Sequence, residues 1–327
     1  MDGGTWSAWT ADGLTVDIPF STTHKISVNN LVLPDSASLN YIRYRVTETG
    51  GAESISAFYL IRVDATPPAA PEGLVASPAA WTNAASFTVS WTNPADVAGI
   101  AGAWYKLDTA PTSPTDGTYV ATQGNIPELI PGERGAGDGA HAVYVWLRDT
   151  LGRADPKTAA MTTLYWDTTA PDPPTWMSGS PARQWTNVNR FSESWRNPFD
   201  LSGIVGAYYK LNSPPESATD GTFVKTVNTI TDISVPRDGR NDIWVWLVDA
   251  AGNVDPTAVQ SHAEVFWYDS TPPASSAVMT PNLPATGWYT SSISMSFSAT
   301  DLPLDAARPP VVEYQLDSAA WVVAPPV

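Results

Sequence analysis

Short segments in which apolar and small polar residues alternate recur along the chain. Residues 87–91 alternate Phe, Val and Trp with Thr and Ser, and residues 293–297 show the same pattern. In residues 143–148, the aliphatic residues Val, Val and Leu alternate with the larger residues Tyr, Trp and Arg. A period of two places successive side chains on opposite faces of a β-strand. Because clusters of Gly, Pro, Asn and Asp separate these segments, the pattern predicts an all-β fold of antiparallel sandwiches.

The chain also repeats itself at the length of a domain. Residues 81–83 (Trp-Thr-Asn) and 115–118 (Thr-Asp-Gly-Thr) each recur 104 positions later. Beyond a variable loop the offset becomes 100, at which residues 145–147 (Val-Trp-Leu) recur. Solenoid repeats are much shorter, so each repeat is predicted to be an independent domain.

Each repeat ends in a joint of an apolar residue, Asp, Thr and Pro. Prolines in these joints fix φ and restrain the preceding residue, so we expect a rod of sandwiches with semi-rigid links. The predicted domains are a C-terminal part of a sandwich at 1–66, complete sandwiches at 67–169 and 170–271, and an N-terminal part of a sandwich at 272–327.

Three motifs point to a known family. They are Gly287-Trp288-Tyr289-Thr290, the Tyr-x-Leu-Asp segments at 105–108 and 314–317, and the turn Asp249-Ala250-Ala251-Gly252-Asn253. With these motifs the chain resembles the bacterial immunoglobulin-like or fibronectin type III-like tandem repeats of large secreted and cell-surface proteins. Residues 151–153 (Leu-Gly-Arg) depart from the Gly-Asn turn. The resemblance implies Ig-like/FnIII-like sandwiches, an extracellular or cell-surface location, and a non-enzymatic structural or adhesive role.

Charge and composition exclude several classes of partner. The chain has 17 Lys+Arg against 33 Asp+Glu, a net charge of −16, whereas nucleic acids and anionic membranes need a basic surface. It has no cysteine, so neither disulfides nor thiolate metal sites are expected. No apolar run reaches the roughly 18 residues of a membrane span, and no signal peptide opens the sequence. We expect no membrane insertion by this segment.

The sequence carries no motif of a catalytic site. Its three histidines, His24, His141 and His262, lie in different segments, and neither Gly-x-Ser-x-Gly nor His-Glu-x-x-His occurs. His141 is expected to pack beside a strand. The glycines of residues 132–139 are followed by no Lys-Ser/Thr pair, so we interpret them as a flexible loop rather than a phosphate site. We therefore expect no enzymatic activity.

Aspartates at the joints and turns suggest a metal. No cofactor is required by the sequence, but Ca²⁺ prefers carboxylate and turn carbonyl oxygens. The alternative is that each Asp caps a turn by accepting a backbone N–H two residues on. Both interpretations stay open for Asp64, Asp149, Asp155, Asp167, Asp249, Asp255 and Asp269.

Aromatic residues form a second candidate site. If Val143, Val145 and Leu147 face the core, their aromatic neighbours face outward. Such a patch is consistent with cross-strand packing, with a protein interface or with a carbohydrate platform. The residues concerned are Trp104, Tyr144, Trp146, Tyr208, Trp244 and Trp246.

The two ends of the chain complement each other. Residues 272–327 contain the first strands of a repeat and residues 1–66 the later ones, with residues 316–327 matching 1–12. We therefore predict that the tail of one chain completes the head of the next and so builds a filament. Excision from a longer array would leave the same split ends. The predicted contact residues are Glu313, Gln315 and Leu316 on one side and Arg43 and Arg45 on the other.

Besides copies of itself, the partners left open by the sequence are a cell-surface protein or a polysaccharide. The competing functional hypothesis is a noncatalytic carbohydrate-binding or spacer module of a larger secreted enzyme.

Overall fold

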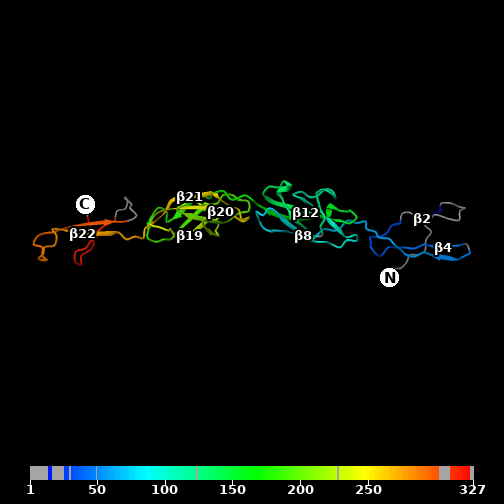
Figure 1. Ribbon diagram of the computed structural model, residues 1–327, viewed down its shortest axis with the longest axis horizontal. Helices are drawn as coiled ribbons and strands as arrows, with labels where there is room; N and C mark the ends of the chain where they lie inside the picture. Colours follow the sequence, from blue (N-terminus) through cyan, green and yellow to red (C-terminus); the bar gives the residue numbers. More distant parts are fainter. Residues whose placement is uncertain are drawn as a thin grey trace. The chain divides into compact units, whose positions relative to one another are not determined.

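The structure is a computed structural model and describes residues 14–16, 26–28, 31–48, 50–122, 124–226, 228–301 and 310–324 (Figure 1). In these residues the regular elements are β-strands and two single-turn 3-10 helices, η1 (Gly132–Arg134) and η2 (Pro156–Thr158). The predicted all-β fold is confirmed. No helix in the described residues has the length and apolarity to cross a membrane.

Internal contacts divide the chain into two units. The first contains the described residues up to Ser77 together with 86–130 and 141–164. The second contains 78–85, 131–140 and the described residues from Tyr165 onward.

The first complete repeat folds into two antiparallel sheets, in the orders β11-β8-β7 and β10-β9-β12-β13. Val143, Val145 and Leu147 on β12 are fully buried, as their alternation predicts. The strands are β7 (Glu72–Ser77), β8 (Phe87–Thr92), β9 (Ile100–Leu107), β10 (Thr118–Val120), β11 (Asn125–Leu129), β12 (Gly139–Asp149) and β13 (Ala160–Trp166).

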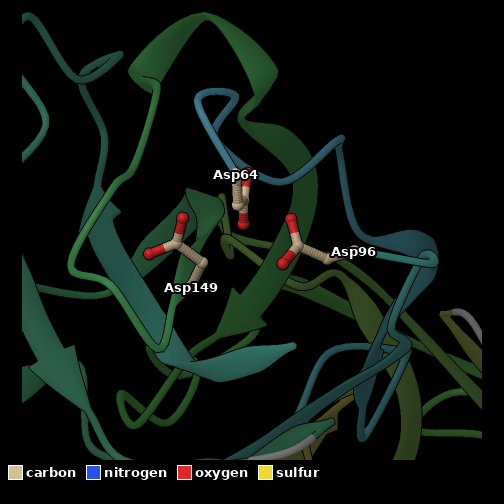
Figure 2. Close-up of side chains that lie close together, drawn as sticks. All are labelled: Asp64, Asp96 and Asp149. Carbon is tan, nitrogen blue, oxygen red and sulfur yellow. The ribbon is translucent and has the colours of Figure 1, made fainter. Parts of the chain in front are cut away.

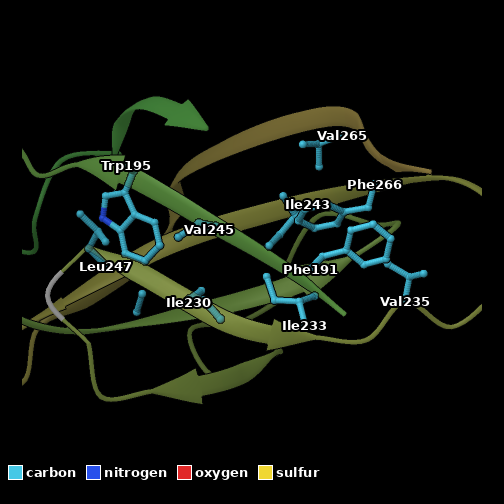
Figure 3. Packing of buried hydrophobic residues seen from close by; sticks show 11 residues of the cluster. Phe191, Trp195, Ile230, Ile233, Val235, Ile243, Val245, Leu247, Val265 and Phe266 are labelled. Carbon is cyan, nitrogen blue, oxygen red and sulfur yellow. The ribbon is translucent and has the colours of Figure 1, made fainter. Parts of the chain in front are cut away.

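The second repeat has a corresponding pair of sheets, β14-β16-β19 and β15-β21-β20-β17-β18, in which the additional edge strand β15 pairs in parallel with β21. Its core draws side chains from both sheets: Phe191 and Trp195 of β16 pack in one cluster with Val245 of β20 and Phe266 of β21 (Figure 3). Two sheets that share one core form a sandwich. The strands are β14 (Thr175–Ser180), β15 (Trp185–Thr186), β16 (Phe191–Arg196), β17 (Ile204–Leu211), β18 (Thr222–Val224), β19 (Thr229–Ile233), β20 (Gly239–Asp249) and β21 (Val254–Tyr268).

The segments outside these repeats form only two-stranded sheets in their described residues: β1-β2, β3-β6, β4-β5, β22-β23 and β24-β25. Apolar residues there are exposed to solvent; for example, Val46 is 57% exposed and Trp288 is 78% exposed. Close to the C-terminus, the strand β24 is limited to Glu313–Tyr314. The strands are β1 (Leu14–Val16), β2 (Ile26–Val28), β3 (Tyr41–Ile42), β4 (Arg45–Thr47), β5 (Glu53–Ile55), β6 (Tyr59–Leu60), β22 (Ala274–Thr280), β23 (Ser294–Thr300), β24 (Glu313–Tyr314) and β25 (Val322–Val323).

Candidate metal centre

Asp64, in the joint before the first sandwich, is held by two backbone groups. Its Oδ1 accepts the N–H of Thr66 at 3.2 Å, and its Oδ2 accepts the N–H of Ala98 at 3.1 Å. The first bond closes an Asx-turn two residues on, which is a local property of Asp. The second bond is long-range and ties the joint to the loop before β9. The carboxylate is thereby fixed with only 7% of the residue exposed.

Asp96 lies in that same loop. Its Oδ1 accepts the N–H groups of Ala98 at 3.1 Å and Gly99 at 2.9 Å. Gly99 has φ +84°, a left-handed conformation that glycine adopts without strain and that lets the chain turn into β9. The loop thus presents its carboxylate toward Asp64 (Figure 2).

Asp149 ends β12 and begins a tight turn. Its backbone N–H donates to the carbonyl of Arg153 at 3.0 Å, and its Oδ1 accepts the N–H of Arg153 at 2.7 Å. The residue is completely buried, yet its Oδ2 has no hydrogen-bond partner. A buried, unsatisfied carboxylate oxygen is costly, so this oxygen is a candidate ligand for a cation.

The three carboxylates converge (Figure 2). Each offers one oxygen such that all three oxygens lie within 4.8 Å of one another. Ca²⁺–oxygen distances are about 2.3–2.6 Å, so two ligands on opposite sides of one ion are separated by roughly this span. An all-oxygen set without His or Cys favours a hard cation over zinc. The buried triad can hold a metal ion.

The electrostatics of this triad agree with that chemistry. Burial, followed by the negative charge of Asp64, raises the pKa of Asp96, and the charge of Asp149 adds to the shift. The Arg153 guanidinium lies beside the triad, with Nη1 3.5 Å from Asp64 Oδ1. Among the described residues, Arg153 is the one cation paired with these three carboxylates, and a bound metal would supply the charge that remains uncompensated.

A second triad repeats the geometry with Asp167, Asp200 and Asp249, whose oxygens also lie within 4.8 Å of one another. Asp167 Oδ2 accepts the N–H of Ser202 at 3.1 Å, and Asp200 Oδ1 accepts the N–H of Gly203 at 2.8 Å. Burial is the leading cause that raises the pKa of both Asp200 and Asp249.

One charged side chain distinguishes the two triads. Asn253 stands where the first turn has Arg153. Its Nδ2 donates to Asp249 Oδ2 at 2.8 Å and to the carbonyl of Asp167 at 2.9 Å. Its backbone N–H donates to Asp249 Oδ1 at 2.7 Å, as the N–H of Arg153 does to Asp149. The turns are alike in their backbone and differ in side-chain charge.

The structure brings together four of the aspartates that the sequence suggested: Asp64, Asp149, Asp167 and Asp249. The other three accept a backbone N–H two residues on, as the capping alternative predicts. Asp155 accepts from Lys157 at 2.9 Å, Asp255 from Thr257 at 2.8 Å and Asp269 from Thr271 at 3.1 Å.

Sequence reasoning missed Asp96 and Asp200. They follow the Asn-Pro pairs of the repeat at the common offset of 104, and this recurrence is the signal that would have found them.

The predicted outward exposure of Trp146 and Trp246 is wrong, because both are completely buried. The indole N–H of Trp146 donates to the carbonyl of Pro114 at 2.9 Å, and that of Trp246 donates to the carbonyl of Ala218 at 2.8 Å. A Cβ added at Gly117 would lie 2.7 Å from the Trp146 ring, so the connection between β9 and β10 covers the indole closely. Alternation identifies the sheet face but not the loop that covers it.

The remaining aromatic candidates are partly buried: Trp104, Tyr144, Tyr208 and Trp244. Trp104 stacks on Trp146 with ring centroids 6.4 Å apart, and Tyr208 stacks on Trp246 at 5.5 Å. These cross-strand ring pairs are stabilising contacts within one sheet.

The histidines occupy separate sites. His141 Nδ1 lies 3.0 Å from Asp108 Oδ2, and His262 Nδ1 lies 3.0 Å from Glu193 Oε1. His24 lies outside the described residues. Residues 132–134 of the glycine-rich segment form η1 instead of an irregular loop.

The predicted head-to-tail residues lie on the terminal segments. Arg45 pairs with Glu53 at 3.2 Å, and the guanidinium of Arg43 lies over the ring of Phe58 at 5.2 Å. Glu313 pairs with Val323 in β24-β25. Gln315 Nε2 donates to the carbonyl of Ala319 at 2.6 Å, and Leu316 is 70% exposed.

Among solved structures, the chain is similar to tandem domains of three proteins. The fibronectin(III)-like modules of Clostridium thermocellum CbhA show 12% identity over 57% of this chain and 90% of that chain, with a TM-score of 0.30. The FN1-FN3 domains of chicken CNTN1 show 16% identity over 68% and 76%, with a TM-score of 0.34. Domains A168-A170 of titin show 14% identity over 75% and 80%, with a TM-score of 0.35.

No protein-family model matches the sequence, and no match is found among curated proteins. Identities and TM-scores this low assign neither family nor function. The sandwich fold rests on the chain's own sheets and core.

Proposed function

We propose that this chain is a non-enzymatic structural and adhesive segment of an extracellular Ig-like repeat protein, in which Ca²⁺ fixes the backbone leading into each sandwich. The observation that carries the proposal is Asp149 Oδ2, a buried and unpartnered oxygen of a carboxylate that lies together with those of Asp64 and Asp96. Asp64 and Asp167 belong to joints, whereas their triad partners belong to the sandwiches that follow. An ion bound by all three would tie each joint to its sandwich.

Calcium suits these sites better than other cations. Ca²⁺ accepts six to eight oxygens in flexible geometry, and three carboxylates leave room for carbonyl and water ligands. Mg²⁺ demands a tighter octahedron and retains more of its waters. Two of the three aspartates in each triad are also buried and the third is partly buried, which strengthens their attraction for a divalent ion.

Calorimetric titration of the full chain with CaCl₂ tests this proposal. We expect two bound ions per chain, one ion for a D149N variant, and none for D149N/D249N. The matched control is D155N/D255N, which removes two turn-capping carboxylates outside the triads and should keep both ions. If the full chain binds no Ca²⁺ at millimolar concentration, or if the control loses binding equally, the proposal fails.

We further propose that copies of the chain join head to tail. Support comes from the apolar side chains exposed on both terminal segments, such as Val46 and Ile55 at one end and Val278 and Met295 at the other. Isolated two-stranded sheets are marginally stable in water, and open strand edges recruit another chain. The contact is heterologous, so repeated addition builds a filament or a ring.

Light scattering and electron microscopy of the chain with and without residues 272–327 test this assembly. The average mass of the particles formed by the full chain should increase with protein concentration, while the truncated chain should remain monomeric. Assembly is disproved if the full chain stays monomeric at high concentration or if the truncated chain still polymerises.

The carbohydrate-binding alternative has lost its main support. It depended on an exposed aromatic face, and the two central tryptophans of that face, Trp146 and Trp246, are covered by loops.

A further inference from the structure

The two triads differ in how their negative charge is balanced. In the first, Arg153 Nη1 is buried without a hydrogen-bond partner and lies 3.5 Å from Asp64 Oδ1. In the second, the equivalent Asn253 is neutral. No Lys or Arg pairs with the second triad within the portion of the chain that the structure describes. With all three carboxylates ionised, the formal charge is −2 at the first site and −3 at the second.

This difference is confined to one side chain. The backbone N–H of residue 153 donates to Asp149 Oδ1, and that of residue 253 donates to Asp249 Oδ1, both at 2.7 Å. The same backbone bond therefore holds Oδ1 of both carboxylates, whereas Asp249 Oδ2 accepts from Asn253 Nδ2 and Asp149 Oδ2 has no hydrogen-bond partner. In the first site a divalent ion must either coexist with the guanidinium or drive it away, and 39% of the Arg153 side chain is already exposed to solvent.

We infer that residue 153, with its counterpart 253, sets the order in which the triads fill. The second triad binds Ca²⁺ at a lower concentration, and the first fills later because Arg153 acts as its built-in counter-ion. This inference rests on the proposed function. It implies two kinds of joint: Ca²⁺ strengthens the joint before the second sandwich at a lower concentration than the joint before the first. A chain with both kinds of joint responds to Ca²⁺ in two steps.

Each triad is measured alone in the full chain by calorimetric titration with CaCl₂. D96N disables the first triad, so its Kd reports the second. D200N disables the second triad, so its Kd reports the first. We expect Kd to be at least about tenfold lower for D96N than for D200N, since like charges a few ångströms apart interact strongly at a partly buried site. In the D200N background, R153M should lower Kd by about tenfold, whereas R153K, which keeps the charge, should leave it nearly unchanged.

The reciprocal variant N253K in the D96N background should raise Kd about tenfold, so the test does not depend on R153M alone. R190M, which removes an exposed arginine outside the triads, is the control for net charge. The inference is overturned if D96N and D200N have equal affinities and neither R153M nor N253K changes them. If the wild-type chain, D96N and D200N all fail to bind Ca²⁺, the proposed function itself fails.

Discussion

The first and second sandwiches share their sheets and turns but differ at a central core position. Val89 of β8 and the equivalent Glu193 of β16 are both 0% exposed. In the second sandwich, Glu193 Oε1 lies 3.0 Å from His262 Nδ1, so the carboxylate has a partner on the opposite sheet. Burial raises the pKa of Glu193, and the hydrogen bond and charge of His262 oppose the increase.

The neighbouring strand explains how the larger side chain fits. Val89 lies opposite Ala76, whereas Glu193 lies opposite Gly179. A Cβ at Gly179 would be 3.0 Å from Glu193 Oε2 and 2.3 Å from Val265 Cγ2, so glycine makes the necessary room. The same position in the two sandwiches therefore holds either an apolar or an ionisable core residue. The ionisable residue requires space on the neighbouring strand and a hydrogen-bond partner on the opposite sheet.

Val89→Glu should have the largest effect, because it buries a carboxylate where Ala76 occupies the space and no partner has been provided. We expect the first sandwich to lose at least about 3 kcal/mol of stability. Hydrogen–deuterium exchange should show lost protection in 87–92 and 143–149 and unchanged protection in 191–196. Equal loss in both sandwiches, or no loss, would contradict the comparison.

His262→Ala should have the next largest effect. It leaves the buried Glu193 carboxyl group without its partner across the two sheets, and breaking such a buried pair costs about 3 kcal/mol. The double variant E193V/H262A, which copies the valine of the first sandwich, should recover most of the loss. The stability of both variants is measured by urea unfolding, with hydrogen–deuterium exchange as the local readout in the second sandwich. If the double variant loses as much stability as His262→Ala alone, His262 acts through packing alone.

Calcium should stabilise each sandwich by about 2.7 kcal/mol at a free concentration of 100 times the Kd of its triad. D249N should abolish the gain in the second sandwich alone, and D149N in the first alone. Thermal unfolding in EDTA and in CaCl₂, with local exchange to separate the sandwiches, makes the measurement. A gain that survives both substitutions would place Ca²⁺ elsewhere.

The smallest expected difference concerns pH. A carboxyl group with a raised pKa retains its proton at a higher pH than usual, and Ca²⁺ must displace it. Two groups with raised pKa values, Asp200 and Asp249, belong to the second triad, and one, Asp96, belongs to the first. As pH falls through these raised pKa values, Ca²⁺ affinity should therefore fall more steeply at the second site.

Calorimetry of D96N and D200N in buffers with different ionisation enthalpies counts the released protons. The second site should release more protons than the first at a pH near the raised pKa values of Asp200 and Asp249, and the difference should vanish well above them. Equal release at both sites would remove this distinction between the triads.

The pH dependence of stability without metal has the opposite sign. Because the folded-state pKa of Glu193, Asp200 and Asp249 is raised, the folded protein binds protons more tightly than the unfolded chain in the window above their ordinary values of 4.5 and 3.8. Their contribution to stability therefore grows as pH falls through the raised values and is lost as pH rises through them.

Local sequence pattern was sufficient for several features. The alternation in residues 143–147 placed Val143, Val145 and Leu147 in the core, and the joint and turn motifs contained four of the six triad aspartates. Asp96 and Asp200 were missed because each lies more than thirty residues from both triad partners, with no local motif linking the three. The covering of Trp146 was missed for a related reason, since the carbonyl that accepts its indole N–H belongs to Pro114.

The sequence by itself determined which residues form strands, which face of a strand is apolar, and which aspartates begin turns. These properties follow from the two-residue period of a strand and from hydrogen bonds that an Asp makes to its near neighbours. The tertiary structure decided which carboxylates converge, which tryptophans are covered, and where a buried glutamate finds a histidine. Each of these depends on segments distant in sequence that meet only when two sheets close over a common core, and no local pattern encodes that meeting.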